Sequence, residues 1–254
     1  MRVVRLLLAA TLCFGAASAC GSSRGATSER DSKLIVFAAA SLDHVLPQLD
    51  KSNEYDFGDS NALTYRIEQG TPADVFVSAT PKYLARLQTE GLLYEKPAWF
   101  AADRLVLIVP RANPGRIRTV RDLLRRGVTL ALGAKGLPAG DHARASLASM
   151  HLRGALKHVV AREVDAEHVV QKVSRGEVDA GFVYHSDAVA AAPRVKEIAL
   201  PRSGREVALY GAAPLKAAKN ATDARGFVAL LLSPPGQAQL KLAGFDPPPK
   251  PPKR

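Results

Sequence analysis

Several apolar runs in this sequence of 254 residues are followed by a hydroxyl side chain or by the start of a helical pattern. Ser41 and Ser60 each stand just before a helical segment, and Tyr184 closes the apolar run 180–183. In open α/β sheets, ligands bind at the carboxyl ends of strands, where helix N-termini present unpaired N–H groups. Neutral O–H and N–H donors at such positions favour a fully ionised oxyanion, because every oxygen of that ligand is a hydrogen-bond acceptor.

Two further positions can offer backbone N–H groups to the same ligand. Ala139 lies in the turn 138–140 before a helical pattern, and Val169 lies near the start of the pattern that begins at about 166. The side chain of Val169 fits a core position on that helix equally well. Hydrogen bonds to a charged group contribute about 1.5–3 kcal/mol each, so roughly five to seven of them can reach the −8 kcal/mol or so of micromolar binding without an arginine.

The residue types of nucleophilic catalysis are present, but their spacing does not align them. Ser41, Asp43 and His44 lie in one helical segment, which directs positions 43 and 44 away from a serine relay, and there is no G-x-S-x-G motif. Asp74 fits a structural carboxylate that accepts turn N–H groups. The six histidines show no metal-ligand spacing. We therefore expect a protein that is not an enzyme, with no cofactor and no side chain that ligates a metal directly.

The elements that must position these residues alternate along the chain, and this alternation predicts an α/β fold with mostly parallel strands. The expected strands are 34–37, 74–78, 104–109, 128–132, 180–184 and 207–210. The expected helices cover 42–49 with Ser41 as N-cap, a segment carrying Leu63 and Ile67, 80–91, 120–126, 140–150, 166–176 and 224–232. Five or six such units fit two lobes.

Both ends of the chain differ in composition from the middle. Residues 1–19 read as a signal peptide, because arginines precede the short apolar run 6–14 and small residues lead to Cys20. The small residues before Cys20 are similar to a bacterial lipobox, although Ala17 stands where leucine is usual, so we expect Cys20 to carry lipid. Residues 20–32 fit a flexible tether, and the Pro/Lys-rich tail 246–254 fits an extended terminus.

The formal net charge is +11, and the basic residues are scattered rather than gathered into a run. A generally basic surface is therefore expected, with no nucleic-acid partner. A positive field would also speed the arrival of a small anion.

Five motifs resemble, in order, those of the molybdate-binding proteins of ABC transporters. They are FAAASL at 37–42, FGDSNAL at 57–63, GTPADVF at 70–76, LPAG at 137–140 and GFVYHSDA at 181–188. The resemblance implies a type II periplasmic-binding-protein fold, in which two α/β lobes flank a ligand cleft. Residues 33–103 and 206–245 would form lobe 1, and residues 104–205 would form lobe 2.

Carried over to these motifs, the resemblance assigns the ligand contacts. Ser41 and Ser60 would bind through hydroxyl and N–H, Ala139 and Val169 through N–H, and Tyr184 through its phenol. The chain departs from the family in two places: the segment between Ser41 and Ser60 is short, and the loop 133–136 is one residue shorter with a lysine, Lys135, where an acid is common. That lysine could reach the rim of the site.

The resemblance implies a protein that captures molybdate or tungstate and delivers it to an ABC permease, and we expect it to be a monomer. Because Cys20 is expected to carry lipid, we expect a lipoprotein on the outer face of the cytoplasmic membrane. Two alternatives stay open from the residues. The first is capture of another small oxyanion, such as sulfate or phosphate, and the second is a structural surface lipoprotein without a transported ligand.

Overall fold

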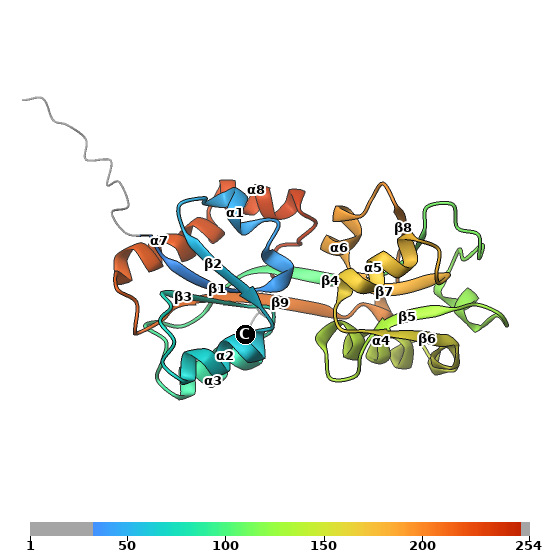
Figure 1. Ribbon diagram of the computed structural model, residues 1–254, viewed down its shortest axis with the longest axis horizontal. Helices are drawn as coiled ribbons and strands as arrows, with labels where there is room; N and C mark the ends of the chain where they lie inside the picture. The colour runs from blue at the N-terminus through green and yellow to red at the C-terminus, as the bar shows by residue number, and fades with distance from the viewer. Residues whose placement is uncertain (1–32, 250–254) are drawn as a thin grey trace, which may run out of the picture. The chain divides into compact units, whose positions relative to one another are not determined.

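The computed structural model describes residues 33–249, which form a nine-stranded mixed sheet covered by helices (Figure 1). The strand order is β2-β1-β3-β9-β4-β7-β5-β6, and β8 pairs with β4. The predicted signal peptide, the lipidation residue Cys20, the tether and the last five residues of the tail lie outside the described residues.

The strands are β1 (Ile35–Ala39), β2 (Glu54–Gly58), β3 (Val75–Ser78), β4 (Ala98–Pro110), β5 (Leu130–Gly133), β6 (Val159–Glu163), β7 (Ala180–Tyr184), β8 (Val195–Ile198) and β9 (Val207–Pro214). The α-helices are α1 (Leu46–Leu49), α2 (Ser60–Glu68), α3 (Pro81–Thr89), α4 (Pro138–Ser149), α5 (Ala166–Ser174), α6 (His185–Ala190), α7 (Ala221–Leu232) and α8 (Pro234–Leu242). Four 3-10 helices complete the set: η1 (Ala40–Leu42), η2 (Val120–Leu124), η3 (Arg153–His158) and η4 (Arg202–Gly204).

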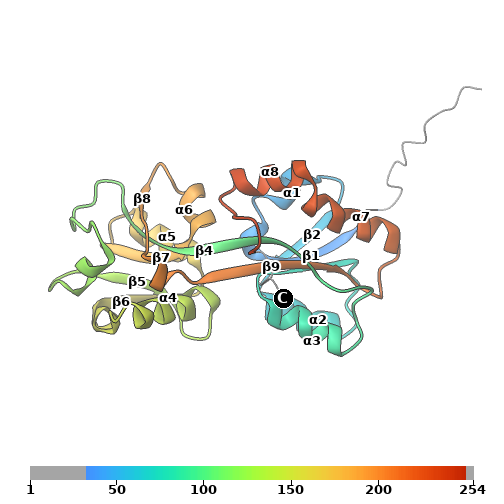
Figure 2. The same cartoon turned by 180° about the vertical axis from the view of Figure 1, so that it is seen from behind.

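The long strand β4 connects two α/β lobes. Its residues up to Arg104 pair with β9, and its residues from Leu105 pair with β7 and β8. Figures 1 and 2 show β4 and β9 running from the group of helices α1, α2, α3, α7 and α8 toward the group α4, α5 and α6. The predicted boundary between residues 103 and 104 lies one residue from this change of partner, and the exact lobe limits stay a prediction.

The register shows that the carboxyl ends of the parallel strands in the two lobes face each other. In the first lobe β1, β2 and β3 are parallel, and β3 runs in the same direction as β4 because both pair antiparallel with β9. In the second lobe β5, β6 and β7 are parallel, and β7 runs against β4. Its last residue, Tyr184, lies opposite Leu105, where β4 changes partners. Residues that follow strands in either lobe therefore point toward this junction.

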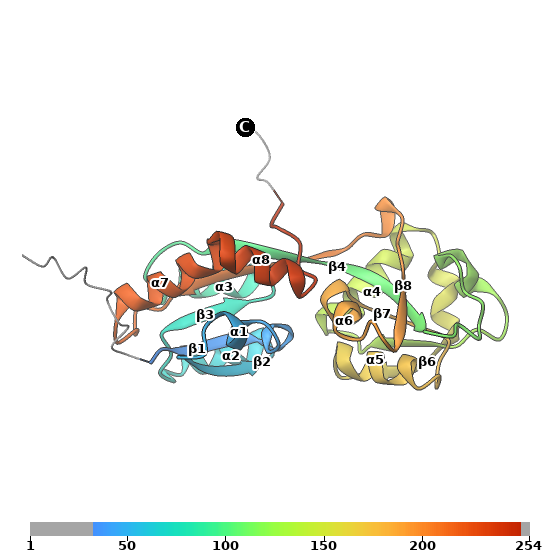
Figure 3. The same ribbon diagram turned by 90° about the horizontal axis from the view of Figure 1, so that it is seen from above.

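Helix starts in the first lobe follow from local side-chain chemistry. The Asp59 carboxylate caps α2 by accepting the N–H groups of Asn61 and Ala62, and Thr80 caps α3 by accepting the N–H of Lys82. Proline is favoured in the first helical turn, which is where Pro81 lies. The helices lie against the strands of their own lobe, and α7 and α8 pack along one side of the first lobe (Figure 3).

The prediction of one helix over 42–49 capped by Ser41 is wrong. The chain forms η1, a turn and the short helix α1 instead, and Ser41 lies inside η1 without capping it. Leu42, Val45 and Leu46, whose spacing suggested one helix, are all buried although the chain does not form a continuous helix here.

Other elements differ in extent or were not expected. β4 begins at Ala98, six residues before the predicted start, and the segment around 120–126 is a 3-10 helix. The short elements β6, β8, α6 and α8 had no clear signal; β6 has an exposed valine, Val160, and α8 begins with two prolines. No helix within residues 33–249 is both long and apolar enough to span a bilayer.

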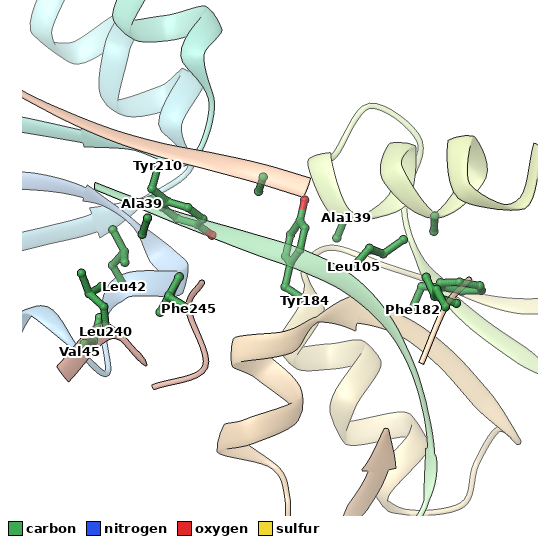
Figure 4. Close-up of a cluster of buried hydrophobic side chains, with 14 of the residues drawn as sticks. Ala39, Leu42, Val45, Leu105, Ala139, Phe182, Tyr184, Tyr210, Leu240 and Phe245 are labelled. Atoms are coloured by element: carbon green, nitrogen blue, oxygen red, sulfur yellow. The ribbon is translucent and has the colours of Figure 1, made fainter. Parts of the chain in front are cut away.

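The largest hydrophobic cluster extends through both lobes along β4 and β9. Figure 4 shows Tyr210 beside Ala39, Leu42 and Phe245, and Tyr184 beside Ala139 and Leu105. The rings of Tyr210 and Phe245 meet edge to face with centroids 5.3 Å apart. The two tyrosines therefore stand on the boundary between a packed core and the facing strand ends.

Candidate solute-binding site

Ser60 offers two hydrogen-bond donors at the first turn of α2. Its side chain is buried, and its Oγ accepts the N–H of Ala79 at 3.3 Å, which leaves the hydroxyl proton for another partner. Because Ser60 is the first residue of the helix, its own N–H has no acceptor within the helix. The capping carboxylate of Asp59 is already occupied by Asn61 and Ala62. A ligand next to Ser60 would thus meet an O–H and an N–H together.

Ser41 follows β1 and is held by a residue of the crossing strand β9. Its Oγ lies 2.8 Å from the phenol oxygen of Tyr210, which is fully buried. Burial raises the pKa of Tyr210, and the nearby carboxylate of Asp103 raises it further, so its hydroxyl keeps its proton. When the phenol donates to Ser41, the serine proton is free to point at a ligand.

Ala139 lies in the first turn of α4, which is pressed against the end of β5. A Cβ added to Gly140 would lie 2.3 Å from the carbonyl oxygens of Gly133 and Ala134, so only glycine fits there. The Arg144 guanidinium donates to the carbonyls of Gly133 at 3.0 Å and Gly140 at 2.7 Å, which ties the strand end to the helix. As the second residue of α4, Ala139 has an N–H without an intrahelical acceptor.

Val169 is completely buried in α5, and its side chain packs in the hydrophobic core, which is the core position that the sequence also allowed for it. The Asp165 side chain caps this helix by accepting the N–H of His168 at 2.8 Å. Val169 is the fourth residue of α5, where the N–H of a regular helix donates to the N-cap carbonyl, here that of Asp165.

Tyr184 ends β7 and is 7% exposed. Its phenol oxygen lies 2.9 Å from Nδ1 of His142, and its N–H donates to Asp187 at 2.9 Å. Burial raises the pKa of the phenol, and the carboxylates of Asp103, Asp187 and Glu206 raise it further. The phenol consequently stays protonated and acts as a neutral donor.

The five predicted residues thus all lie after a parallel strand or near a helix start at the facing strand ends, without touching one another through a hydrogen bond in the described chain. The loop carrying Lys135 is exposed, and within the described residues no side-chain bond links this lysine to any of the five. Their role as ligand contacts stays a prediction.

Three residues that the sequence did not single out support this region. Tyr210 holds Ser41, His142 contacts Tyr184, and Asp103 holds the start of α6 by accepting the N–H groups of His185 at 3.0 Å and Ser186 at 3.3 Å. The sequence offered one signal for Asp103, which is a charged residue close before the apolar run 105–109. Nothing in the spacing of His142 marks it out.

Asp103 is fully buried and is the most perturbed carboxyl group near the site. One of its oxygens, Oδ2, has no hydrogen-bond partner within residues 33–249, and the same holds for Oγ of Ser186. Burial raises the pKa of Asp103 to about 8, an effect that its hydrogen bonds to Ser186 and His185 reduce and the charge of Asp187 increases. Burial also raises the pKa of Asp187 to about 6. The site can therefore hold a neutral carboxyl where a carboxylate would repel an anion.

The candidate donors are hydroxyls, a phenol and backbone N–H groups, all uncharged. Residues 33–249 contain no cluster of three or more His, Cys, Asp or Glu side chains that could hold a metal ion. Chemically, the arrangement can bind a small acceptor-rich anion from two sides.

Comparison with known proteins gives a consistent result. The family model described as "Bacterial extracellular solute-binding protein" matches residues 50–246. The molybdate-binding protein of Mycobacterium tuberculosis is 31% identical, over 97% of this chain and 96% of that protein. A candidate ABC transporter substrate-binding lipoprotein of Bacillus subtilis is 30% identical, over 72% of this chain and 75% of that protein.

Among solved structures, the substrate-binding domain of a candidate molybdenum ABC transporter from Clostridium difficile superposes with a TM-score of 0.74. It is 30% identical and covers 85% of this chain and 98% of its own. The two lobes and the facing strand ends thus define a type II periplasmic-binding-protein fold, the class that binds solutes for transport and is not enzymatic. The chain belongs to the family of bacterial extracellular solute-binding proteins. The fold, the family resemblance and the absence of an enzymatic role predicted from the sequence are confirmed.

Proposed function

We propose that this protein captures molybdate or tungstate and delivers it to the permease of an ABC transporter. The observation that carries the proposal is the set of neutral donors at the facing strand ends of both lobes, with the Ser60 hydroxyl and the Tyr184 phenol both buried. A dianion without protons suits such a set, because a protonated competitor would bring a hydrogen that meets no acceptor. The names of the similar Mycobacterium and Clostridium proteins support the choice of molybdate.

In this proposal the ligand contacts come from both lobes. Ser41 and Ser60 bind from the first lobe through O–H and N–H, whereas Ala139, Val169 and Tyr184 bind from the second. Because the donors come from two lobes that β4 and β9 join, binding draws the lobes together. Roughly five to seven hydrogen bonds of about 1.5–3 kcal/mol each sum to about 8–21 kcal/mol before the costs of desolvation and association, and micromolar affinity needs a net value of about −8 kcal/mol. No cofactor takes part.

The protein is exported and held on the outer face of the cytoplasmic membrane by a lipid on Cys20, and it acts as a monomer without a nucleic-acid partner. An extracellular family and a Bacillus subtilis relative named as a candidate lipoprotein support this location. The tether 20–32 would let the lobes reach a permease in the same membrane.

Isothermal titration of the exported Cys20→Ser protein with molybdate, tungstate, sulfate and phosphate at neutral pH tests the proposal. We expect one-to-one binding of molybdate and tungstate at micromolar concentration or tighter, and compaction in solution scattering when either is added. Binding of sulfate or phosphate alone would assign another oxyanion. No heat of binding for any of the four anions, together with an unchanged scattering curve, would favour a structural surface lipoprotein.

A further inference from the structure

The imidazole of His142 lies directly against the phenol of Tyr184. Its Nδ1 is 2.9 Å from the phenol oxygen, and the two rings meet edge to face at 89° with centroids 5.9 Å apart. His142 lies three residues after Ala139 on α4, so both face the same side of that helix. His142 therefore contacts one proposed ligand-binding residue, Tyr184, and lies one helical turn from another, Ala139.

The hydrogen bond between these side chains has two possible directions, and only one leaves the phenol proton available to an approaching anion. The phenol has one proton. If Nδ1 of His142 is bare, it accepts that proton, and Tyr184 presents only lone pairs to an approaching anion. If Nδ1 carries hydrogen, it donates to the phenol oxygen, and the phenol proton is left to point toward the ligand.

The surroundings of His142 favour a neutral ring. Burial lowers its pKa, and the opposing charges come from Glu206, in the segment before β9, and from Asp141 on its own helix. A neutral imidazole has one N–H, whose position is set by the partner of the other nitrogen. Because His142 is only partly buried, its Nε2 can accept from water while Nδ1 keeps the hydrogen.

We propose that His142 is a positioning residue for anion capture: its Nδ1–H donates to the phenol oxygen of Tyr184 and thereby turns the phenol proton toward the bound oxyanion. The inference rests on the proposed function, because it concerns the same site. It adds a residue that contacts no ligand yet decides whether the phenol attracts or repels one.

Two substitutions separate the hydrogen bond from the packing. His142→Asn keeps a side-chain N–H donor close to the position of Nδ1, whereas His142→Phe keeps the ring and its edge-to-face contact but removes the donor. With molybdate as the probe in isothermal titration, we expect the dissociation constant to rise about three- to tenfold for His142→Phe, as for loss of one neutral hydrogen bond, because the phenol is no longer held with its proton toward the anion. His142→Asn should stay within about twofold of the parent protein.

A double substitution tests whether the effect passes through the phenol. In a Tyr184→Phe background, His142→Phe should weaken binding no further, because the group that it orients is gone. His151→Asn serves as the matched control: His151 is exposed and has a φ of 59°, a conformation that asparagine tolerates, and its dissociation constant should match the parent. Parental affinity in His142→Phe, an equal loss in His142→Asn, or additive losses in the double variant would overturn the inference.

Long-range ¹⁵N–¹H correlation spectra of the ligand-free protein give a readout that needs no ligand. We expect the His142 resonances of the Nδ1–H form, and their change in Tyr184→Phe. The Nε2–H form in the parent protein would overturn the inference by itself. If the parent protein binds none of the four oxyanions, the proposed function fails, while the spectra still decide the direction of the hydrogen bond.

Discussion

Replacing Asp103 by asparagine should stabilise this protein at neutral and alkaline pH. The Asp103 side chain is fully buried, its Oδ1 accepts the N–H groups of His185 and Ser186, and its Oδ2 has no partner within residues 33–249. In Asp103→Asn, the amide oxygen can accept the same two N–H groups, and the amide N–H₂ can donate to the Ser186 hydroxyl, which also lacks a partner in that range. The substitution thus removes a buried charge and keeps the bonds that hold α6.

The magnitude follows from the pKa of Asp103, which burial raises from 3.8 to about 8 in the folded protein. Between these values the unfolded chain releases a proton that the folded chain keeps, so the free energy of unfolding falls as pH rises and levels off above about 8. At pH 7 the interval from 3.8 is about 3 units, and at ~1.36 kcal/mol per unit this gives roughly 4 kcal/mol. Relaxation around a buried carboxylate makes this figure an upper limit.

Urea denaturation from pH 4 to pH 9, followed by circular dichroism, measures this effect. We expect Asp103→Asn to match the parent near pH 4 and to exceed its free energy of unfolding by up to roughly 4 kcal/mol at pH 7. Asp43→Asn, a substitution on the exposed turn after η1, serves as the control and should stay within about 1 kcal/mol of the parent, because it removes only an exposed ion pair with His44. The same pH slope in Asp103→Asn as in the parent, or a less stable variant at pH 8, would refute the reasoning.

Three further predictions concern the site, the fold and the anchor. Ser60→Ala and Ser41→Ala should each weaken molybdate binding by about 1–3 kcal/mol in isothermal titration while leaving the thermal midpoint within a few degrees of the parent; parental affinity in both would mean that the site is misplaced. Gly140→Ala should lower the free energy of unfolding by about 1–3 kcal/mol, because its Cβ would meet two carbonyl oxygens at 2.3 Å. Gly226→Ala has open space around it and should leave that free energy unchanged or raise it by up to about 1 kcal/mol. Similar stability of the two variants in urea denaturation would contradict the packing argument. Cys20→Ser should move the protein from the membrane fraction to the soluble fraction on immunoblots of cell fractions, and retention in the membrane would count against lipidation.

Alternation of apolar runs and helical patterns was enough to predict the α/β class and most of the strands. The buried strands β3, β5 and β7 are short apolar runs followed by polar or glycine residues, which local sequence shows directly. β4 was predicted too short because its first residues, 98–103, combine small, aromatic and charged side chains. They are strand because β9 pairs with them, and β9 lies about 100 residues further along the chain.

The positions of the candidate site were predictable, but the side chains that support it were not. Each of the five predicted residues follows a strand or opens a helix, and these locations are local properties of the chain. The contacts of Ser41 with Tyr210 and of Tyr184 with His142 span 169 and 42 residues. Such pairs depend on the register of β9 and on the packing of α4 against β7, which a single sequence does not encode in its spacing.

The most direct test of the account is a crystal structure of the protein grown with molybdate, with the metal located by its anomalous scattering. We predict one molybdenum peak between the lobes, with its oxygens within hydrogen-bond distance of Ser60 and Tyr184 and with no lysine or arginine in contact. A peak that instead lies against basic side chains, or on the surface of one lobe only, would contradict capture by neutral donors from both lobes.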